Sequence, residues 1–307
     1  MILDVNFFPG WVRKSITFTI DDGNLRLDRK LIDYVKPAGI KGTFNLITPL
    51  DPGFSPDSYR QQYEGYEIAN HSRYHTHSLF DGVDYTVCDE PFDRETADPR
   101  FLYKTEEEGL YYMHTYAWNR ASCDKLYMEY VDSCTRDLEN VFGKGSIRGY
   151  VWPYGAQKNK NVFEQLKARG FQSIRAAGCV KDTTGFSLPA DRFAWSYNAD
   201  DRCLNDIARL YEALPDDGQL KFFCFGVHAH DFENHGTWGE LEAFCKTMGC
   251  RPDSYWYAVN HEIFDYEDAV NRLRISGSTI TNPGEVDLYI KADGQKHIVR
   301  AGETLRL

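Results

Sequence analysis

The sequence predicts an α/β fold: a distorted (β/α) barrel of about seven parallel strands with a small C-terminal antiparallel β appendage. Short apolar runs alternate with helical patterns between residues 16 and 273, and this order places strands in one parallel sheet covered by helices. About seven such repeats favour a barrel. After Arg274, Asn-Pro-Gly, Asp-Gly and Ala-Gly turns separate short alternating runs, which is typical of antiparallel hairpins.

Hydrophobic spacing and helix-ending residues define the expected elements. Apolar residues recur every four positions over residues 27–35, and Pro37 and Gly39 then end the helix. The expected strands are 16–20, 42–47, 66–69 (a short strand or a turn), 147–152, 171–174, 220–227 and 255–259. The expected helices are 27–35, 57–62, 126–142, 162–169, 204–214, 238–248 and 262–273.

The domain division follows from these elements. We assign residues 1–274 to the barrel and residues 275–307 to the appendage. Residues 81–125 are irregular and rich in acidic residues, tyrosine and phenylalanine, so we interpret them as an insertion over a site. The appendage can cap the barrel or make a subunit contact, which leaves a homo-oligomer open.

Composition limits the partners and the compartment. The net charge of −11 argues against nucleic acid or an anionic membrane surface as a partner. No stretch has a signal-peptide pattern or approaches the roughly 20 apolar residues of a membrane helix. Eight cysteines without a CxxC pair fit a reducing compartment, although a disulfide between Cys245 and Cys250 stays open. We therefore expect a cytoplasmic protein.

Polar, titratable groups follow one expected strand after another, and several are of types that bind metals. The residues after each strand are Asp21 and Asp22 after residues 16–20 in the sequence FTIDDG, His71 and His75 after 66–69, Pro153 and Tyr154 after 147–152, Arg175 after 171–174, and His228 after 220–227. The carboxyl ends of parallel strands meet at one face of a barrel, so these side chains are expected to meet there. Taken alone, Asp-Asp-Gly is an ordinary solvated turn.

The histidine spacing favours a metal site over that turn. His71 and His75 are four residues apart, so both imidazoles share a face if the segment is helical. A single histidine is more often a hydrogen-bonded core or surface residue, but two at ligand spacing beside an aspartate pair favour a cation. One aspartate of FTIDDG then binds the cation, and the other takes a proton from a water held there.

Four motifs in order resemble those of the polysaccharide deacetylase (NodB homology) family. They are TIDDG (19–23), YEIANHSRYH (66–75), YVWPYG (150–155) and VHAHDF (227–232), and the resemblance covers about residues 15–273. The resemblance implies a bacterial, metal-dependent carbohydrate esterase with a distorted (β/α) barrel, and a hydrolase that acts on carbon–nitrogen bonds other than peptide bonds.

The resemblance also implies roles for single residues. Asp21 matches the general base, and His228 matches the histidine that protonates the leaving amine. The matches to the metal ligands are Asp22, His71 and His75. Tyr154 follows Pro153 and matches the residue whose backbone N–H stabilises the oxyanion. We expect Pro153, Tyr154, His230 and Trp195 to contact the substrate, with His230 where relatives often carry an aromatic residue.

One position departs from the family pattern. The third motif usually has an arginine two residues before the proline, where this chain has Val151, and that arginine orients the base. Arg148 and Arg175 are the candidates to replace it, and we prefer Arg175 because it follows an expected strand.

The expected function is removal of an N-acetyl or similar acyl group from a small carbohydrate or oligosaccharide. The expected cofactor is one divalent metal, zinc before cobalt, manganese or iron, all of which an Asp-His-His set accepts. Two alternatives stay open: the same metal site acting on a non-sugar C–N amide, and a catalytically silent carbohydrate-binding relative.

Overall fold

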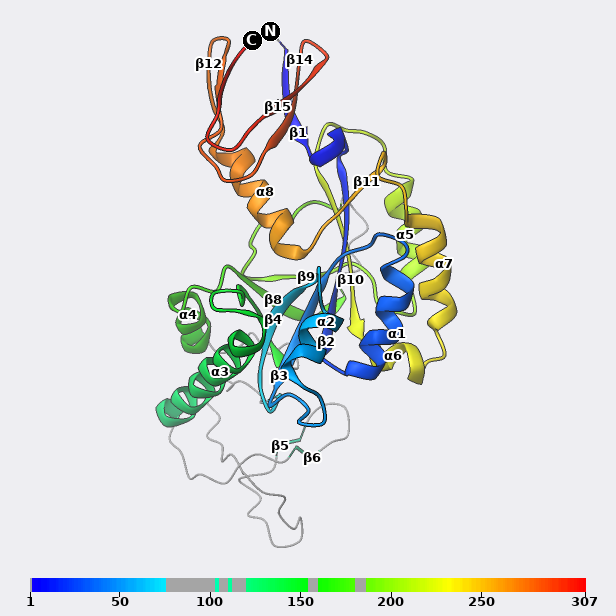
Figure 1. The fold of residues 1–307 in the computed structure, drawn as a ribbon, viewed down its shortest axis with the longest axis vertical. Helices are drawn as coiled ribbons and strands as arrows, with labels where there is room; N and C mark the ends of the chain where they lie inside the picture. The colour runs from blue at the N-terminus through cyan, green and yellow to red at the C-terminus, as the bar shows by residue number, and fades with distance from the viewer. Residues whose placement is uncertain (1, 76–102, 105–109, 112–119, 154–159, 180–185) are drawn as a thin grey trace, which may run out of the picture.

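A parallel sheet curls into a barrel (Figure 1), which confirms the predicted fold class. Seven of its eight strands follow one another in hydrogen-bonded order, and the eighth, β11 (Tyr255–Tyr257), pairs in parallel with residues 14–16. The computed structural model describes residues 2–75, 103–104, 110–111, 120–153, 160–179 and 186–307. In spatial order the seven strands are β10 (Lys221–His228), β2 (Lys14–Asp22), β3 (Thr43–Thr48), β4 (Glu67–Arg73), β7 (Gly149–Val151), β8 (Ser173–Cys179) and β9 (Trp195–Tyr197). Hydrogen bonds from Asn198 N to Cys224 O (2.7 Å) and from Gly226 N to Ala199 O (2.9 Å) join the segment after β9 to β10 and close the ring.

Side chains of β2 alternate between an apolar outer face and a polar interior. Ile16, Phe18 and Ile20 are buried in the main apolar core. Thr17 and Thr19 lie between them in sequence, are also buried, and accept or donate hydrogen bonds inside the barrel. Because successive residues of a strand face opposite sides of a sheet, the odd-numbered residues of β2 point inward, and Asp21 continues that row.

Helices cover the outer face. They are α1 (Leu25–Val35), α2 (Pro56–Gln62), α3 (Arg120–Phe142), α4 (Lys160–Ala168), α5 (Leu204–Glu212), α6 (Ala229–Asn234), α7 (Trp238–Met248) and α8 (Asn260–Arg272). The side chain of Asn24 accepts a hydrogen bond from Leu27 N (3.1 Å) and caps the first turn of α1. Helices α3 and α4 lie on one side of the barrel, and α1, α5, α6 and α7 lie on the other (Figure 1).

The N-terminus of α8 closes the end of the barrel where the strands begin. Thr17 Oγ1 donates to Asn260 Oδ1 (3.1 Å), and His261 N donates to Glu67 Oε2 (3.0 Å). The ring of His261 also contacts the Glu67 carboxylate. Burial alone would raise the pKa of Glu67, but His261 beside it holds that pKa below its usual range. This end of the barrel is therefore filled, and the opposite end is left for a site.

The appendage consists of two three-stranded antiparallel sheets. One contains β1 (Leu3–Phe7), β14 (Leu288–Ala292) and β15 (Gln295–Val299), and the other contains β12 (Arg274–Ser276), β13 (Thr279–Thr281) and β16 (Thr304–Arg306). We had assigned the first residues to the barrel, but β1 pairs with β14, with Leu3 opposite Ala292. Both chain termini consequently lie in the appendage (Figure 1).

Three other local expectations differ from the structure. Strand β4 runs on through Arg73, so the segment that holds His71 is extended and not helical. Strand β8 runs on through Cys179, so Arg175 lies within it and not after its end. Within the expected insertion, β5 (Tyr103–Lys104) pairs with β6 (Leu110–Tyr111), α3 begins at Arg120, and the other residues before α3 lie outside the described residues.

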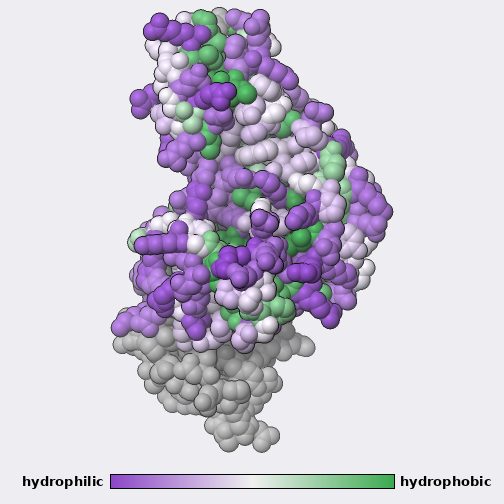
Figure 2. Space-filling view, in the orientation of Figure 1, coloured by the Kyte–Doolittle hydropathy of each residue, from purple (hydrophilic) through white to green (hydrophobic). Residues whose placement is uncertain are grey.

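Most of the surface in Figure 2 is hydrophilic, with apolar patches on the appendage and the barrel. Four of the large exposed apolar side chains belong to the appendage or its ends: Ile2, Ile275, Ile298 and Leu307. Cys245 and Cys250 are both free thiols, so the disulfide that the sequence left open is not formed. Among the described residues, no helix combines the length and apolar character needed to cross a membrane.

A buried carboxyl group on α1 makes stability depend on pH. Asp28 Oδ2 accepts a hydrogen bond of 2.6 Å from the Tyr63 hydroxyl. Burial raises the pKa of Asp28 to about 8, so the folded protein keeps a proton there that the unfolded chain loses above about pH 4. Since the folded state binds more protons between these values, the free energy of unfolding falls as the pH rises through that range.

We expect Asp28→Asn to raise the free energy of unfolding at pH 8. In the wild type this free energy should fall by up to about 1.4 kcal/mol per pH unit between about pH 4 and pH 8, and the variant should lose that pH dependence. Urea unfolding of both proteins at pH 5 and pH 8 measures this. Asp33→Asn changes an exposed carboxylate of the same helix and is the matched control. A pH dependence that Asp28→Asn leaves unchanged would contradict the assignment.

Candidate metal-binding and catalytic site

The carboxyl ends of β2, β4 and β10 bring five polar side chains together. The Nε2 atoms of His71 and His75 lie 3.5 and 3.7 Å from Asp22 Oδ1. The Nε2 atom of His228 lies 3.8 Å from Asp22 Oδ2. Asp21 is opposite His228 in the register of β2 and β10. The group thus forms at the end of the barrel away from α8.

The backbone of FTIDDG explains how two adjacent aspartates serve one site. Neighbouring residues of a regular strand point to opposite faces, but Asp22 has a φ of 77°, in the left-handed region. The turn continues through Gly23, with a φ of 80°, where a Cβ atom would lie 2.6 Å from Leu46 Cδ2. Gly23 is therefore required, and the turn it permits lets Asp22 reach the histidines.

The two histidines converge by a different route from the one we expected. Three residues at and just after the end of β4 have positive φ values: Ser72, Tyr74 and His75 (66°, 59° and 50°). These conformations turn the chain back, and the rings of His71 and His75 lie 4.8 Å apart at 62° to each other. Their nitrogens can therefore point at one position without a helix.

The donor atoms fit a divalent cation. Asp22 Oδ1 and His71 Nε2 are buried and have no hydrogen-bond partner among the described residues. His71 Nδ1 lies 3.0 Å from the carbonyl oxygen of Val151, which only accepts, so the neutral ring keeps its lone pair on Nε2. Burial, together with His71, lowers the pKa of His75 to about 4, the neutral ligand form. A carboxylate and two neutral imidazoles are the ligand types that zinc and related metals bind.

Asp21 is held as a carboxylate. Arg175 Nη2 and Asn45 Nδ2 both donate to Asp21 Oδ1, Asn45 at 2.7 Å. Burial alone would raise the pKa of Asp21, but the Arg175 guanidinium, with His71 and His228, holds it far below its usual range. Arg175 comes from β8, and its side chain is only 1% exposed. Arg148 instead pairs with Asp265 on α8.

His228 is paired with an aspartate that the sequence analysis missed. Asp231 Oδ2 accepts hydrogen bonds from His228 N (3.0 Å) and from His228 Nδ1 (2.9 Å). Burial would lower the pKa of His228, but Asp231, Asp21 and Asp22 raise it to about 9. The spacing was a usable signal, because an acidic residue three positions after a helix N-cap is the capping-box pattern, and His228 caps α6.

His230 does not form a second metal site with this pair. His228, His230 and Asp231 lie close enough together to hold a cation. However, the two imidazole rings are stacked, with centroids 4.7 Å apart at 19°, so their in-plane lone pairs run parallel and do not converge. His230 instead covers one face of His228.

Three further predicted residues have different outcomes. Pro153 is buried directly after β7, and Tyr154 lies outside the described residues. Trp195 is not at the group: it packs edge-on against Phe222 and Phe264, with ring centroids 5.9 and 5.5 Å away. Phe264 belongs to α8, so Trp195 fills the closed half of the barrel.

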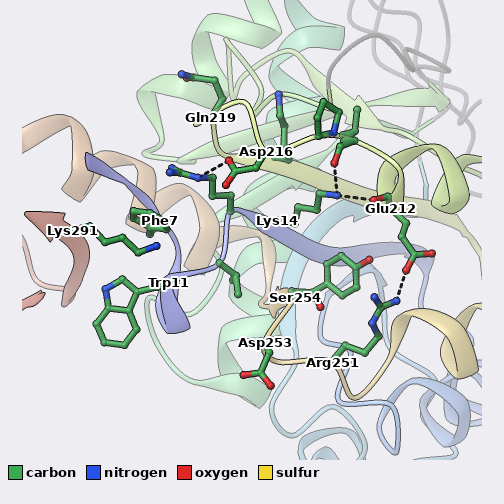
Figure 3. A pocket seen from close by; sticks show the side chains of 16 residues that line it. Phe7, Trp11, Lys14, Glu212, Asp216, Gln219, Arg251, Asp253, Ser254 and Lys291 are labelled. Carbon is green, nitrogen blue, oxygen red and sulfur yellow. Dashed lines mark hydrogen bonds and ion pairs between the residues drawn. The ribbon is translucent and has the colours of Figure 1, made fainter. Parts of the chain in front are cut away.

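A cavity of about 370 Å³ lies beside the starts of β2 and β10, away from this group, and is lined largely by residues outside the barrel strands (Figure 3). Several of its charged side chains already bind one another or backbone carbonyls. Arg13 pairs with Asp216 (2.8 Å), and Lys14 Nζ donates to three carbonyl oxygens at 2.9–3.0 Å. Arg13 and Lys14 are therefore already engaged, and the group at the end of β2 is the better candidate for chemistry.

Comparison with known proteins identifies the family. The sequence model of the family described as polysaccharide deacetylase matches residues 12–174. The putative polysaccharide deacetylase YheN of Bacillus subtilis (strain 168) is 26% identical over 199 residues, which cover 55% of this chain and 68% of that protein. The chain therefore belongs to the polysaccharide deacetylase family.

Solved structures with related folds are less similar in sequence. The polysaccharide deacetylase Bc1974 from Bacillus cereus has a TM-score of 0.46 at 17% identity, covering 82% of this chain and 94% of that one. A family 4 acetyl xylan esterase from Clostridium thermocellum, in complex with a cobalt ion, has a TM-score of 0.47 at 12% identity, covering 83% and 91%.

We expect a divalent cation to raise the melting temperature of the wild-type protein by several degrees, since a hundredfold excess over Kd adds about 2.7 kcal/mol. The double variant His71→Ala/His75→Ala should show no such shift. Calorimetry of dialysed protein with and without Zn²⁺ or Co²⁺, with elemental analysis, measures both. His297→Ala, in the appendage, is the control for loss of a histidine elsewhere. An equal shift in the double variant would contradict the site.

Proposed function

We propose that the protein is a metal-dependent hydrolase that removes an N-acetyl or similar acyl group from a small carbohydrate or oligosaccharide. One observation carries the proposal: the Asp21 carboxylate paired with Arg175, the His228 imidazole paired with Asp231, and the donor atoms of Asp22, His71 and His75 lie together at one end of the barrel. Membership of the polysaccharide deacetylase family supports the same reaction.

The residues suited to hold the metal are Asp22, His71 and His75. A divalent metal bound there, zinc before cobalt, manganese or iron, supplies a Lewis acid for the substrate carbonyl and lowers the pKa of water.

Asp21 is the proposed general base. It takes a proton from the attacking water as the new C–O bond forms at the acyl carbon. Arg175 keeps Asp21 ionised and supplies the guanidinium that this chain lacks at Val151, where the family's third motif usually has an arginine. The backbone N–H of Tyr154 is the proposed donor to the oxyanion.

His228 is the proposed general acid. Its Nδ1–H is held by Asp231, so the proton on Nε2 is the one available to the substrate. As the C–N bond breaks, that proton passes to the leaving nitrogen, which departs as an amine. With a pKa near 9, the ring carries this proton at neutral pH, which suits an acid.

The substrate contacts and the location are also proposals. We propose that Pro153, Tyr154 and His230 contact the sugar, because in sequence they follow β7 and β10, two strands that end at the site. We propose a cytoplasmic enzyme acting on a small or nucleotide-linked sugar.

We expect Asp21→Asn and His228→Gln each to lower kcat by about 10²–10⁴-fold, as removal of a general base or acid does. Acetate release from acetylated mono- and oligosaccharides is the assay. Asp33→Asn and His297→Gln are matched controls that make the same chemical changes away from the site. Near-native turnover in Asp21→Asn would refute the role of the base. Bound metal without acetate release would redirect the search to other amides.

We expect Arg175→Met to lower kcat by at least about tenfold, because Asp21 then loses the guanidinium that stabilises its ionised form. Arg148→Met should stay within threefold of wild type, since Arg148 pairs with Asp265. Steady-state kinetics on the same substrate compare the two variants. Equal losses in both would show that Arg175 has no special role.

A further inference from the structure

Asn45 on β3 makes two hydrogen bonds with one amide nitrogen. The side chain is buried, and Nδ2 donates to Asp21 Oδ1 and to Thr19 Oγ1, both at 2.7 Å. These bonds use both N–H groups of the amide. The reversed amide would put its oxygen against the Asp21 carboxylate, so the carboxylate sets the orientation.

This arrangement lowers the stability of the folded state. The Asn45 Oδ1 atom is buried and has no hydrogen-bond partner among the described residues. An unsatisfied buried acceptor costs about 1–3 kcal/mol, and an apolar side chain of the same size would avoid that cost. A local feature that weakens the fold beside reacting groups is typical of a functional position.

Arg175 approaches the same carboxylate oxygen. Its Nη2 donates to Asp21 Oδ1, its Nη1 donates to the carbonyl oxygen of Ala176 (3.0 Å), and its buried Nε has no partner among the described residues. Arginine usually grips both oxygens of a carboxylate with its fork of N–H groups. Here both donors, Arg175 and Asn45, bind Oδ1, and Asp21 Oδ2 accepts no hydrogen bond from the part of the chain that the structure describes.

We propose that Asn45 is a positioning residue that holds the Asp21 carboxylate with Oδ2 free, so that Oδ2 is the atom that removes the proton. The inference rests on the proposed role of Asp21 as the general base. Without the amide, the carboxylate can rotate and the Arg175 fork can close on both oxygens. The base would then stay ionised but have its reacting oxygen occupied.

The decisive variant is Asn45→Leu, which keeps the size and removes both donors. We expect kcat to fall about 10- to 100-fold, the usual loss when a group that orients a catalytic residue is removed. KM and the bound metal should be unchanged, and the free energy of unfolding should be equal to or above that of wild type. Thr19→Val removes the other partner of the amide and should change kcat less than threefold.

Asn45→Thr is measured in parallel in case the leucine variant does not fold, since its shorter side chain also lacks the reach to Asp21. If both folded variants keep kcat within threefold of wild type while Asp21→Asn is inactive, the inference is wrong and the proposed function stands. Activity retained in Asp21→Asn would instead contradict the proposed function, because Asp21 would then not be the general base. A fall in kcat together with lost metal or lower stability would make Asn45 structural and overturn the inference.

Discussion

The buried ion pair between Asp21 and Arg175 is the interaction on which the site depends. A charge placed in a protein interior costs several kcal/mol unless it is paired and hydrogen-bonded. Asp21 and Arg175 come from β2 and β8, which are separated by three other strands in the sheet. The pair therefore crosses the inside of the barrel, and the interior side chains must leave space for the Arg175 guanidinium.

Small and polar residues inside the barrel provide this space. The Arg175 guanidinium lies 5.4 Å from the centroid of the Tyr197 ring, and Tyr197 fits only because position 226 is glycine. A Cβ on Gly226 would lie 2.2 Å from a carbon of the Tyr197 ring. The outer face of the same strands is apolar and packs under the helices, so stability comes mainly from outside the barrel and chemistry from inside it.

Much of the site was predictable because parallel strands end at one face whatever their exact lengths. This rule placed Asp21, Asp22 and His228 together from their positions after apolar runs. The rule does not cover Trp195, which follows no expected strand and packs in the closed half of the barrel. It also did not give the conformation around His71, because the left-handed residues Ser72, Tyr74 and His75 have no local sequence signal.

The sequence by itself determined the fold class, the order of most strands and helices, and the residues that can bind a metal, because hydrophobic periodicity and strand-end chemistry are local. Tertiary structure alone decided that β1 joins the appendage, that Arg175 reaches Asp21 from within β8 while Arg148 pairs with Asp265, and that Asn45 shares that carboxylate. Asp21 and Arg175 are 154 residues apart. Contacts at such separations depend on the spatial order of strands and on which layer of the interior each side chain fills, and no short stretch of sequence holds that information.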